Sequence, residues 1–308
     1  MHPALELWEH VSADEIYMLA GWRQWADGGS VSSELPQYLI AKMGARQIGK
    51  LKSDSFYFFQ LPGTQQFLRP EIKLEDGVRK ELRHQGSDIW YWGNEHKGLV
   101  IFIGDEPHMN AEQYAEAFFS IAQELKVKRI IGVGGVLGPV PFDQDRQITC
   151  TYSLPRMRDE LENYAVSFSN YEGGVSIGSY LLDQAEKLGI EYCVFYALVP
   201  MYDVSQIAAA LNPIMIEHDY QAWRDVMRCV NHMFQLDFDL LDLDEKSREL
   251  GDAMQAQIDE LDEKMPQLKI KEQLEKLGQD FQETPFLPLD DVWRHGLEDI
   301  FNDDKGDQ

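Results

Sequence analysis

The chain has 308 residues, of which 44% are hydrophobic and 11% aromatic, and its formal net charge is −25. This length allows one large domain or two smaller ones with an ordinary core. The negative charge argues against nucleic acid and anionic membranes as partners, because binding to both needs clustered Lys and Arg. No apolar run approaches the length of a membrane span, so no membrane segment is expected.

The cellular location is expected to be the cytoplasm. The N-terminal residues MHPALELWEH lack the basic segment and apolar core of a signal peptide. The cysteines Cys150, Cys193 and Cys229 are far apart and odd in number, without metal-ligand spacing. Such cysteines are typical of reduced thiols in a cytoplasmic protein.

The first part of the chain predicts a strand at 15–21, a polar loop at 22–30 and a helix carrying Leu35 and Leu39. Two β-rich segments are expected within 46–61, the second ending in the aromatic run Phe56-Tyr57-Phe58-Phe59. Residues 62–88 read as loop and then as a polar stretch.

The stretch 98–145 predicts a strand–helix–strand unit. The run at 98–104 is apolar without alternation, which suits a strand covered on both faces. Asn110, with Gln113 three residues later, predicts a capping box at the start of a helix. The apolar run 130–133 returns as a second strand, parallel to the first. A strand at 89–91 should pair antiparallel with 98–103 through a turn at Gly93-Asn94.

Further strands and helices alternate up to residue 200. We expect a strand at 149–152, a short helix at 156–163, a helix ended by Gly189, and a last strand at 191–199 stopped by Pro200. This alternation predicts an α/β fold with helices on both faces of a sheet.

The composition changes near residue 217. Residues 217–308 contain 25 acidic and 10 basic residues, so they carry −15 of the total charge. Two helical apolar stripes follow, and the second favours a helical hairpin or short coiled coil, or a helix packed on its own domain. We therefore expect a domain at 1–216, an acidic helical C-terminal extension at 217–308, and a disordered tail from about 302.

No familiar catalytic or metal-binding motif is present. Gly132, Gly134 and Gly138 are one residue too widely spaced for a dinucleotide fingerprint, and Pro139 and Pro141 follow where its helix should begin. The eight histidines show no metal-ligand spacing. We expect no cofactor and no metal, and the catalytic residues, if any, are unknown.

Three loops after expected strands form the candidate ligand site. If those strands are parallel, the loops meet at the carboxyl edge of the sheet, where α/β proteins bind ligands. Paired carboxylates there could act as acid and base or bind hydroxyl groups. The alternative is structural, with the aspartates capping backbone amides and the glycines permitting tight turns. The candidate residues are Asp27, Gly28, Gly29, Asp105, Glu106, Gly134 and Gly135.

Four segments along the chain form a characteristic series. They are Trp22 to Gly29, Gly104-Asp105-Glu106-Pro107 opening a helix, VGGVLGPVP ending at Pro141, and Leu198-Val199-Pro200-Met201-Tyr202. Together they resemble the proteasome assembly chaperone 2 family, in its bacterial branch. The similarity covers about residues 12–260. It implies an α/β/α sandwich similar to purine nucleoside phosphorylases, with a helical C-terminal extension.

The chain departs from the family pattern at two histidine positions and at its end. Related members have a Pro-His motif after the glycine strand and Pro-His-Tyr after the last strand, where this chain has Pro141-Phe142 and Pro200-Met201-Tyr202. Chaperones that dock on proteasome cylinders end in hydrophobic-Tyr-X, whereas this sequence ends Gly306-Asp307-Gln308. Docking through such a tail is therefore not expected.

The leading functional hypothesis is a non-enzymatic protein that acts through protein–protein contacts, as a homo-oligomer or with a protein partner. The alternative is a nucleoside-like small-molecule binder or enzyme that uses a phosphorylase-like cleft lined by Asp27, Asp105 and Glu106.

Overall fold

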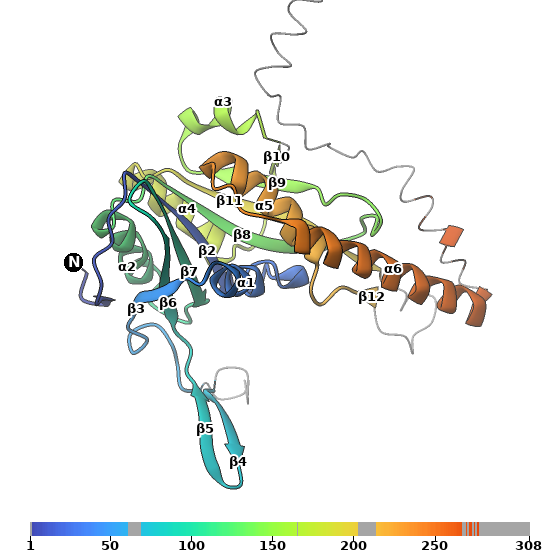
Figure 1. The fold of residues 1–308 in the computed structure, drawn as a ribbon, viewed down its shortest axis with the longest axis horizontal. Coiled ribbons are helices and arrows are strands. Elements are labelled where there is room, and N and C mark those ends of the chain that lie inside the picture. The colour runs from blue at the N-terminus through green and yellow to red at the C-terminus, as the bar shows by residue number, and fades with distance from the viewer. Residues whose placement is uncertain are drawn as a thin grey trace, which may run out of the picture.

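The computed structural model describes residues 2–60, 69–164, 166–202, 214–266, 269, 271, 272, 274 and 276. In this part of the chain a ten-stranded mixed sheet forms the centre of the molecule, with strand order β1-β3-β6-β7-β2-β8-β11-β9-β10 and β12 paired to β11 (Figure 1). Its strands are β1 (Leu5–Leu7), β2 (Glu15–Arg23), β3 (Arg46–Leu51), β6 (Ser87–Gly93), β7 (Lys97–Asp105), β8 (Arg129–Gly138), β9 (Ile148–Tyr152), β10 (Val166–Phe168), β11 (Tyr192–Tyr202) and β12 (Ile214–Met215).

The middle of the sheet is parallel. β2 lies between β7 and β8 and pairs parallel with both, and β8 pairs parallel with β11. The expected strands at 98–104 and 130–133 are therefore confirmed as parallel. β6 pairs antiparallel with β7 through the turn after Gly93, also as expected.

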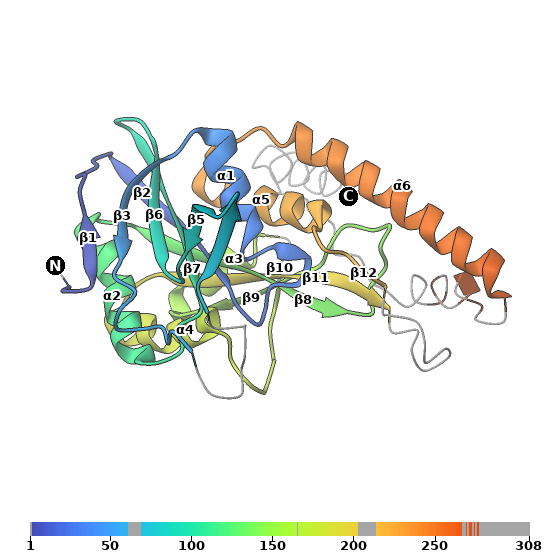
Figure 2. The ribbon, with the colours of Figure 1, turned by 90° about the horizontal axis from the view of Figure 1, so that it is seen from below.

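Helices cover both faces of the sheet (Figure 2). Side chains alternate along β2, so Leu19 joins one buried cluster while Met18 and Ala20 join the other. Burying each large apolar side chain stabilises the fold by about 1.5–3 kcal/mol. One cluster includes α1 (Glu34–Met43), α5 (Tyr220–Phe234) and α6 (Leu241–Lys264), and the other includes α2 (Ala111–Glu124) and α4 (Ile177–Leu188). The short helices are η1 (Gly28–Ser30), η2 (Pro155–Met157) and α3 (Arg158–Leu161).

The two expected apolar stripes after residue 217 lie on α5 and α6. Trp223, Val226 and Val230 of α5 are buried in the same cluster as the sheet residue Leu19. α6 packs on α5 and runs on beyond the sheet in both views. The division at residues 216 and 217 stays a prediction, and the expected tail from about 302 lies outside the described residues. None of the described helices combines the length and apolar character that a membrane crossing requires.

Four local expectations were wrong. Residues 71–83, expected as a polar loop, form a hairpin of β4 (Glu71–Glu75) and β5 (Val78–Arg83). The aromatic run 56–59 contains no strand. Pro200 lies inside β11, opposite Gly138, rather than ending the strand. Asn110 precedes α2 with a φ of +56° and without a capping hydrogen bond, and its side-chain amide donates to the Ser55 carbonyl oxygen at 2.8 Å.

Gly134 and Gly135 lie inside β8 and not in a turn after it. Gly135 is in close contact with the loop after β2, where a Cβ atom would lie 1.9 Å from the Gly28 carbonyl oxygen. A Cβ atom on Gly134 would meet the Tyr196 ring at 2.6 Å. The absence of side chains at these positions lets the loop lie directly on the strand.

A buried ion pair joins α5 to the loop that follows β8. The Arg146 guanidinium donates from Nε to Asp219 Oδ2 at 2.8 Å, and the two side chains are 1% and 0% exposed. Arg146 Nη1 also donates to three carbonyl oxygens of its own loop. Asp219 Oδ1 accepts from the Ala222 amide at 3.0 Å and caps α5. The hydrogen bonds of Arg146 and Asp219 thus satisfy the buried pair and reach both the loop after β8 and the start of α5.

Replacing Asp219 with alanine should destabilise the protein by about 3–5 kcal/mol, because Arg146 would be left as a buried, unpaired cation. Urea unfolding measures this change. The matched control is Asp183→Ala, which removes the partner of Lys187 from a pair that is about 60% exposed on both sides. That control should cost less than about 1 kcal/mol. Equal small effects of both substitutions would contradict the role given to the buried pair.

Replacing Gly135 with alanine should destabilise the protein by about 1–3 kcal/mol, because the new methyl group overlaps the Gly28 backbone. Gly138 provides a control in the same strand, since nothing lies within 4 Å of a Cβ atom built there. Gly138→Ala should change the free energy of unfolding by less than about 1 kcal/mol. The two variants are compared by urea unfolding, and an equal loss from Gly138→Ala would count against the close contact.

Candidate functional site

Two of the three candidate segments are loops at the carboxyl edge of the parallel strands, and they lie beside the third, Gly134-Gly135, which is inside β8. Asp27, in the loop after β2, forms an isolated parallel bridge with Gly135 of β8. The Glu106 amide, just after β7, donates to the Arg23 carbonyl oxygen at 3.1 Å. The loops are therefore connected to one another by backbone contacts.

The Asp105 carboxylate is occupied by groups of the protein itself. Arg23 donates to both of its oxygens, at 2.6 and 3.1 Å, and the Gly86 amide donates to Oδ2 at 2.9 Å. The Asp105 side chain is 9% exposed. Burial acts to lower the pKa of the Arg23 guanidinium, but its hydrogen bonds to Asp105 and the attraction of nearby acidic groups together outweigh burial and raise that pKa. Arg23 and Asp105 therefore form an ion pair joined by two hydrogen bonds.

Glu106 binds the N-terminus of α4. Its Oε1 accepts from the Ile177 amide at 2.7 Å, and its Oε2 accepts from the Trp25 amide at 3.3 Å. The amides at a helix N-terminus are a ready site for an anion. Here the protein's own carboxylate fills that site, so a phosphate group could bind there only by displacing Glu106.

The Asp27 carboxylate binds backbone amides a few residues further along the chain. Its Oδ1 accepts from the Ser32 and Ser33 amides at 2.8 and 2.9 Å. Burial raises the pKa of the Asp27 carboxyl, although these hydrogen bonds act in the other direction. The contacts of Asp27 match the structural alternative that the sequence left open.

Gly28 and Gly29 bring the backbone close to other elements. Gly29 has a φ of +60°, and a Cβ atom there would lie 2.6 Å from Asp219 Cβ. Its carbonyl oxygen accepts from the Asp219 amide at 3.0 Å and from Trp223 Nε1 at 2.9 Å. These glycines therefore join the loop after β2 to α5. The role of the seven candidate residues in ligand binding stays a prediction.

Two neighbouring hollows lie beside this edge and share Arg23, Arg83 and Gln85 in their walls. The first, of about 790 Å³, is also lined by Asp27, Asp105 and Glu106. The four candidate glycines do not line either hollow. The predicted carboxylates therefore face a common space, although their hydrogen bonds are directed to the protein.

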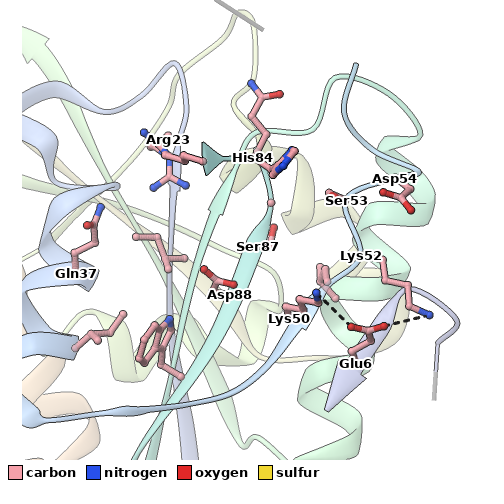
Figure 3. Close-up of a pocket in the computed structure, with 17 residues that line it drawn as sticks. Glu6, Arg23, Gln37, Lys50, Lys52, Ser53, Asp54, His84, Ser87 and Asp88 are labelled. Atoms are coloured by element: carbon pink, nitrogen blue, oxygen red, sulfur yellow. Dashed lines mark ion pairs between the residues drawn. The ribbon is translucent and has the colours of Figure 1, made fainter. Parts of the chain in front are cut away.

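The second hollow, of about 730 Å³, lies on the sheet face beside α1 (Figure 3). Its wall includes Asp88 of β6 together with Lys50 and Glu6, which form an ion pair at 3.6 Å. Burial raises the pKa of the Asp88 carboxyl. Trp90 also lines the hollow, and its buried Nε1 atom has no hydrogen-bond partner.

The sequence did not identify these wall residues. Arg23 and Arg83 are separated by 60 positions and belong to no motif, so only the folded chain brings them to Asp105. Asp88 does have a recognisable feature in the sequence, because it is a charged residue that directly precedes an apolar β segment.

Four exposed apolar side chains belong to segments at the carboxyl edge. Trp25 is 71% exposed, and its ring lies 3.7 Å from a Cβ atom built on Gly174. Val175 is 60% exposed, and Val136 and Leu137 near the end of β8 are 40% and 39% exposed. We call these four residues the apolar rim. Exposed apolar surface can mark a protein-binding site.

No metal site is formed by the described residues, since they contain no group of three or more His, Cys, Asp or Glu side chains that could hold an ion. The three cysteines are free and buried. Buried thiols in apolar surroundings are poor nucleophiles.

The fold is similar to several solved structures of low sequence identity. The proteasome-assembly chaperone homologue Rv2125 of Mycobacterium tuberculosis shares 19% identity at a TM-score of 0.66, over 79% of this chain and 95% of that one. A PAC2 family protein from Streptomyces avermitilis shares 20% identity at a TM-score of 0.67, over 80% of this chain and 97% of that one. PbaB, an archaeal proteasome activator from Pyrococcus furiosus, shares 18% identity at a TM-score of 0.57, over 82% of this chain and 97% of that one.

No curated protein sequence matches this chain significantly. The model of the PAC2 family matches residues 22–258, which is most of the chain and includes the carboxyl edge, α5 and most of α6. The family resemblance inferred from the sequence is thereby confirmed, and the chain belongs to the PAC2 family.

Proposed function

We propose that this protein acts through contacts with other protein chains and not as an enzyme. The observation that supports this most strongly is the state of the three predicted carboxylates. Asp27 and Glu106 accept from backbone amides, and Asp105 accepts from Arg23 and the Gly86 amide. A general acid or base needs a free position toward its substrate, and these groups are engaged by the fold.

The family relatives support the same proposal. Two solved structures with this fold are described as a proteasome-assembly chaperone homologue and as a proteasome activator. Both descriptions concern proteins that work by contacting other proteins. A cytoplasmic location belongs to the proposal as well, because three free, buried cysteines suit a reducing compartment.

The apolar rim is the proposed surface for such contacts. Its largest member, Trp25, projects from the loop after β2, and exposed tryptophans are common at the energetic centre of protein interfaces. The Trp25 backbone is held in place by Glu106, so the side chain is presented from a fixed position.

Replacing Trp25 with alanine should weaken partner binding by about thirtyfold or more, which corresponds to about 2 kcal/mol. Partners are first isolated by cross-linking in cells, and their affinity is then measured with purified proteins. Leu188→Ala is the matched control, because Leu188 is 49% exposed at the other end of α4 and should leave affinity unchanged. The proposal would be contradicted if the unaltered protein, Trp25→Ala and Leu188→Ala bound equally well. It would also be contradicted if none of the three bound a partner saturably.

A second candidate function is binding of a nucleoside-like small molecule, as in a phosphorylase-like cleft. The observation that favours it is the pair of adjoining hollows, each within the size range of small-molecule sites. Arg83 is 43% exposed between them and lies 3.6 Å from Asp105, so it could turn toward a ligand's acidic group.

A thermal-unfolding screen with nucleosides and nucleotides tests this second candidate. A bound compound at 100 times its dissociation constant should stabilise the protein by about 2.7 kcal/mol. The stabilisation should be lost in Arg83→Ala and retained in Arg79→Ala, since Arg79 lies on the same hairpin but lines neither hollow. If no compound shifts the transition, the small-molecule function is rejected.

A further inference from the structure

The second hollow, beside α1, is lined by both polar and apolar side chains (Figure 3). A row of cross-strand neighbours belongs to its wall, formed by Glu6 of β1, Lys50 of β3, Asp88 of β6 and Ile103 of β7. Residues that lie opposite each other in neighbouring strands project from the same face of a sheet. Trp90 follows Asp88 by two positions and extends that face. At about 730 Å³, the hollow has room for a small metabolite.

The wall of this hollow is basic, although the chain as a whole is acidic. Its charged residues are the basic Arg23, Lys50, Lys52 and Arg83 and the acidic Glu6, Asp54 and Asp88. At physiological salt, exposed charges more than about 10 Å apart are largely screened from one another. The charges of the wall itself, rather than the net charge of −25, therefore decide which ligand the hollow attracts.

Three of these cations have only long ion pairs. Lys50 and Lys52 each lie 3.6 Å from one carboxylate, that of Glu6. Arg83 comes no closer than 3.6 Å to an acidic group of the described residues. Three exposed ion pairs elsewhere in the chain have N–O distances of 2.6 Å, within the range of a hydrogen bond. Lys52 donates to the Pro3 carbonyl oxygen at 3.0 Å, but the three cations together keep several N–H groups for an acceptor from outside.

Glu6 indicates the kind of group that the two lysines attract. A carboxylate carries a single charge, so the charge of one lysine is not balanced by Glu6. A phosphate monoester carries a charge of about −1.5 to −2 at neutral pH and has three strong acceptor oxygens. It therefore matches Lys50 and Lys52 better than the Glu6 carboxylate does.

Asp88 provides an acceptor on the other side of Lys50. Its Oδ1 accepts from Gln47 Nε2 at 2.8 Å, and an ionised carboxylate has further acceptor positions. Burial raises the pKa of the Asp88 carboxyl, although the charges of Arg23 and Lys50 act in the other direction. Because burial disfavours the charged form, the Asp88 carboxylate gains from an added hydrogen-bond donor such as a hydroxyl group.

We propose that the second hollow binds a small phosphate monoester that also carries hydroxyl groups, such as a sugar phosphate. The phosphate group takes the place of Glu6 between Lys50 and Lys52, and a hydroxyl group of the ligand donates to Asp88. This inference rests on the second candidate function, small-molecule binding, of which it names the ligand class and the hollow. It does not involve the apolar rim.

Isothermal titration calorimetry tests this site with glycerol 3-phosphate, ribose 5-phosphate and glucose 6-phosphate. At least one of them should bind saturably, whereas glycerol, ribose and glucose should not, because they lack the group that the lysines bind. Inorganic phosphate should bind at least about tenfold more weakly than the best sugar phosphate, since it cannot reach Asp88 from its place between the lysines.

Lys50→Gln should weaken binding of that sugar phosphate by about tenfold or more. Lys73→Gln is the matched control, because it removes the same charge from an exposed residue of β4 that does not line the hollow. It should leave the affinity unchanged. Glu6→Gln should tighten binding by about threefold or more, since it removes the carboxylate that competes with the phosphate group. Urea unfolding checks that each variant is folded.

The inference would be overturned if no sugar phosphate bound saturably, or if inorganic phosphate or a phosphate-free parent bound as tightly. Equal affinities of Lys50→Gln and Lys73→Gln, or weaker binding by Glu6→Gln, would also overturn it. Trp25→Ala should bind the sugar phosphate normally, so this result is independent of partner binding. If a nucleoside stabilises the protein through Arg83 and Lys50→Gln changes nothing, the second candidate function stands and only this inference is lost.

Discussion

The buried ion pair between Arg146 and Asp219 joins two segments of this structure that lie 73 positions apart in the sequence. Two charges with almost no exposure are tolerable only when hydrogen bonds satisfy their remaining polar atoms. Arg146 gathers the loop after β8 around its guanidinium, and Asp219 caps α5. Gly29 accepts from the Asp219 amide, so the loop after β2 is fixed by the same junction. α5 is thus held on the sheet by an ion pair and hydrogen bonds as well as by apolar burial.

The carboxyl edge of the sheet is also filled with groups of the protein itself. In many α/β proteins that edge is open, and ligands bind to free loop amides and helix N-termini. Here Asp219 caps α5, Glu106 caps α4, and Asp27 accepts from the amides before α1. The N-termini of α4 and α5 are thus capped by carboxylates of the protein itself. The features that this edge exposes are the apolar rim and the two hollows beside it.

The central strands were predictable from the sequence because each consists of consecutive apolar residues. The sequence also placed the loops after β2 and β7 at one edge, which follows from parallel pairing, whereas Gly134 and Gly135 lie inside β8. Glu106 and Ile177 lie 71 positions apart, and no pattern in the sequence connects a carboxylate to a helix end at that distance. The hairpin was missed for a different reason. Asp76-Gly77 between β-prone residues was a usable turn signal, but the charged residues around it favoured a polar loop.

Net charge and local charge carry different information in this chain. A net charge of −25 limits which partners approach the molecule, whereas residues 71–83 are neutral. The apolar rim belongs to an edge built on buried polar contacts, while the hairpin stands apart from the core.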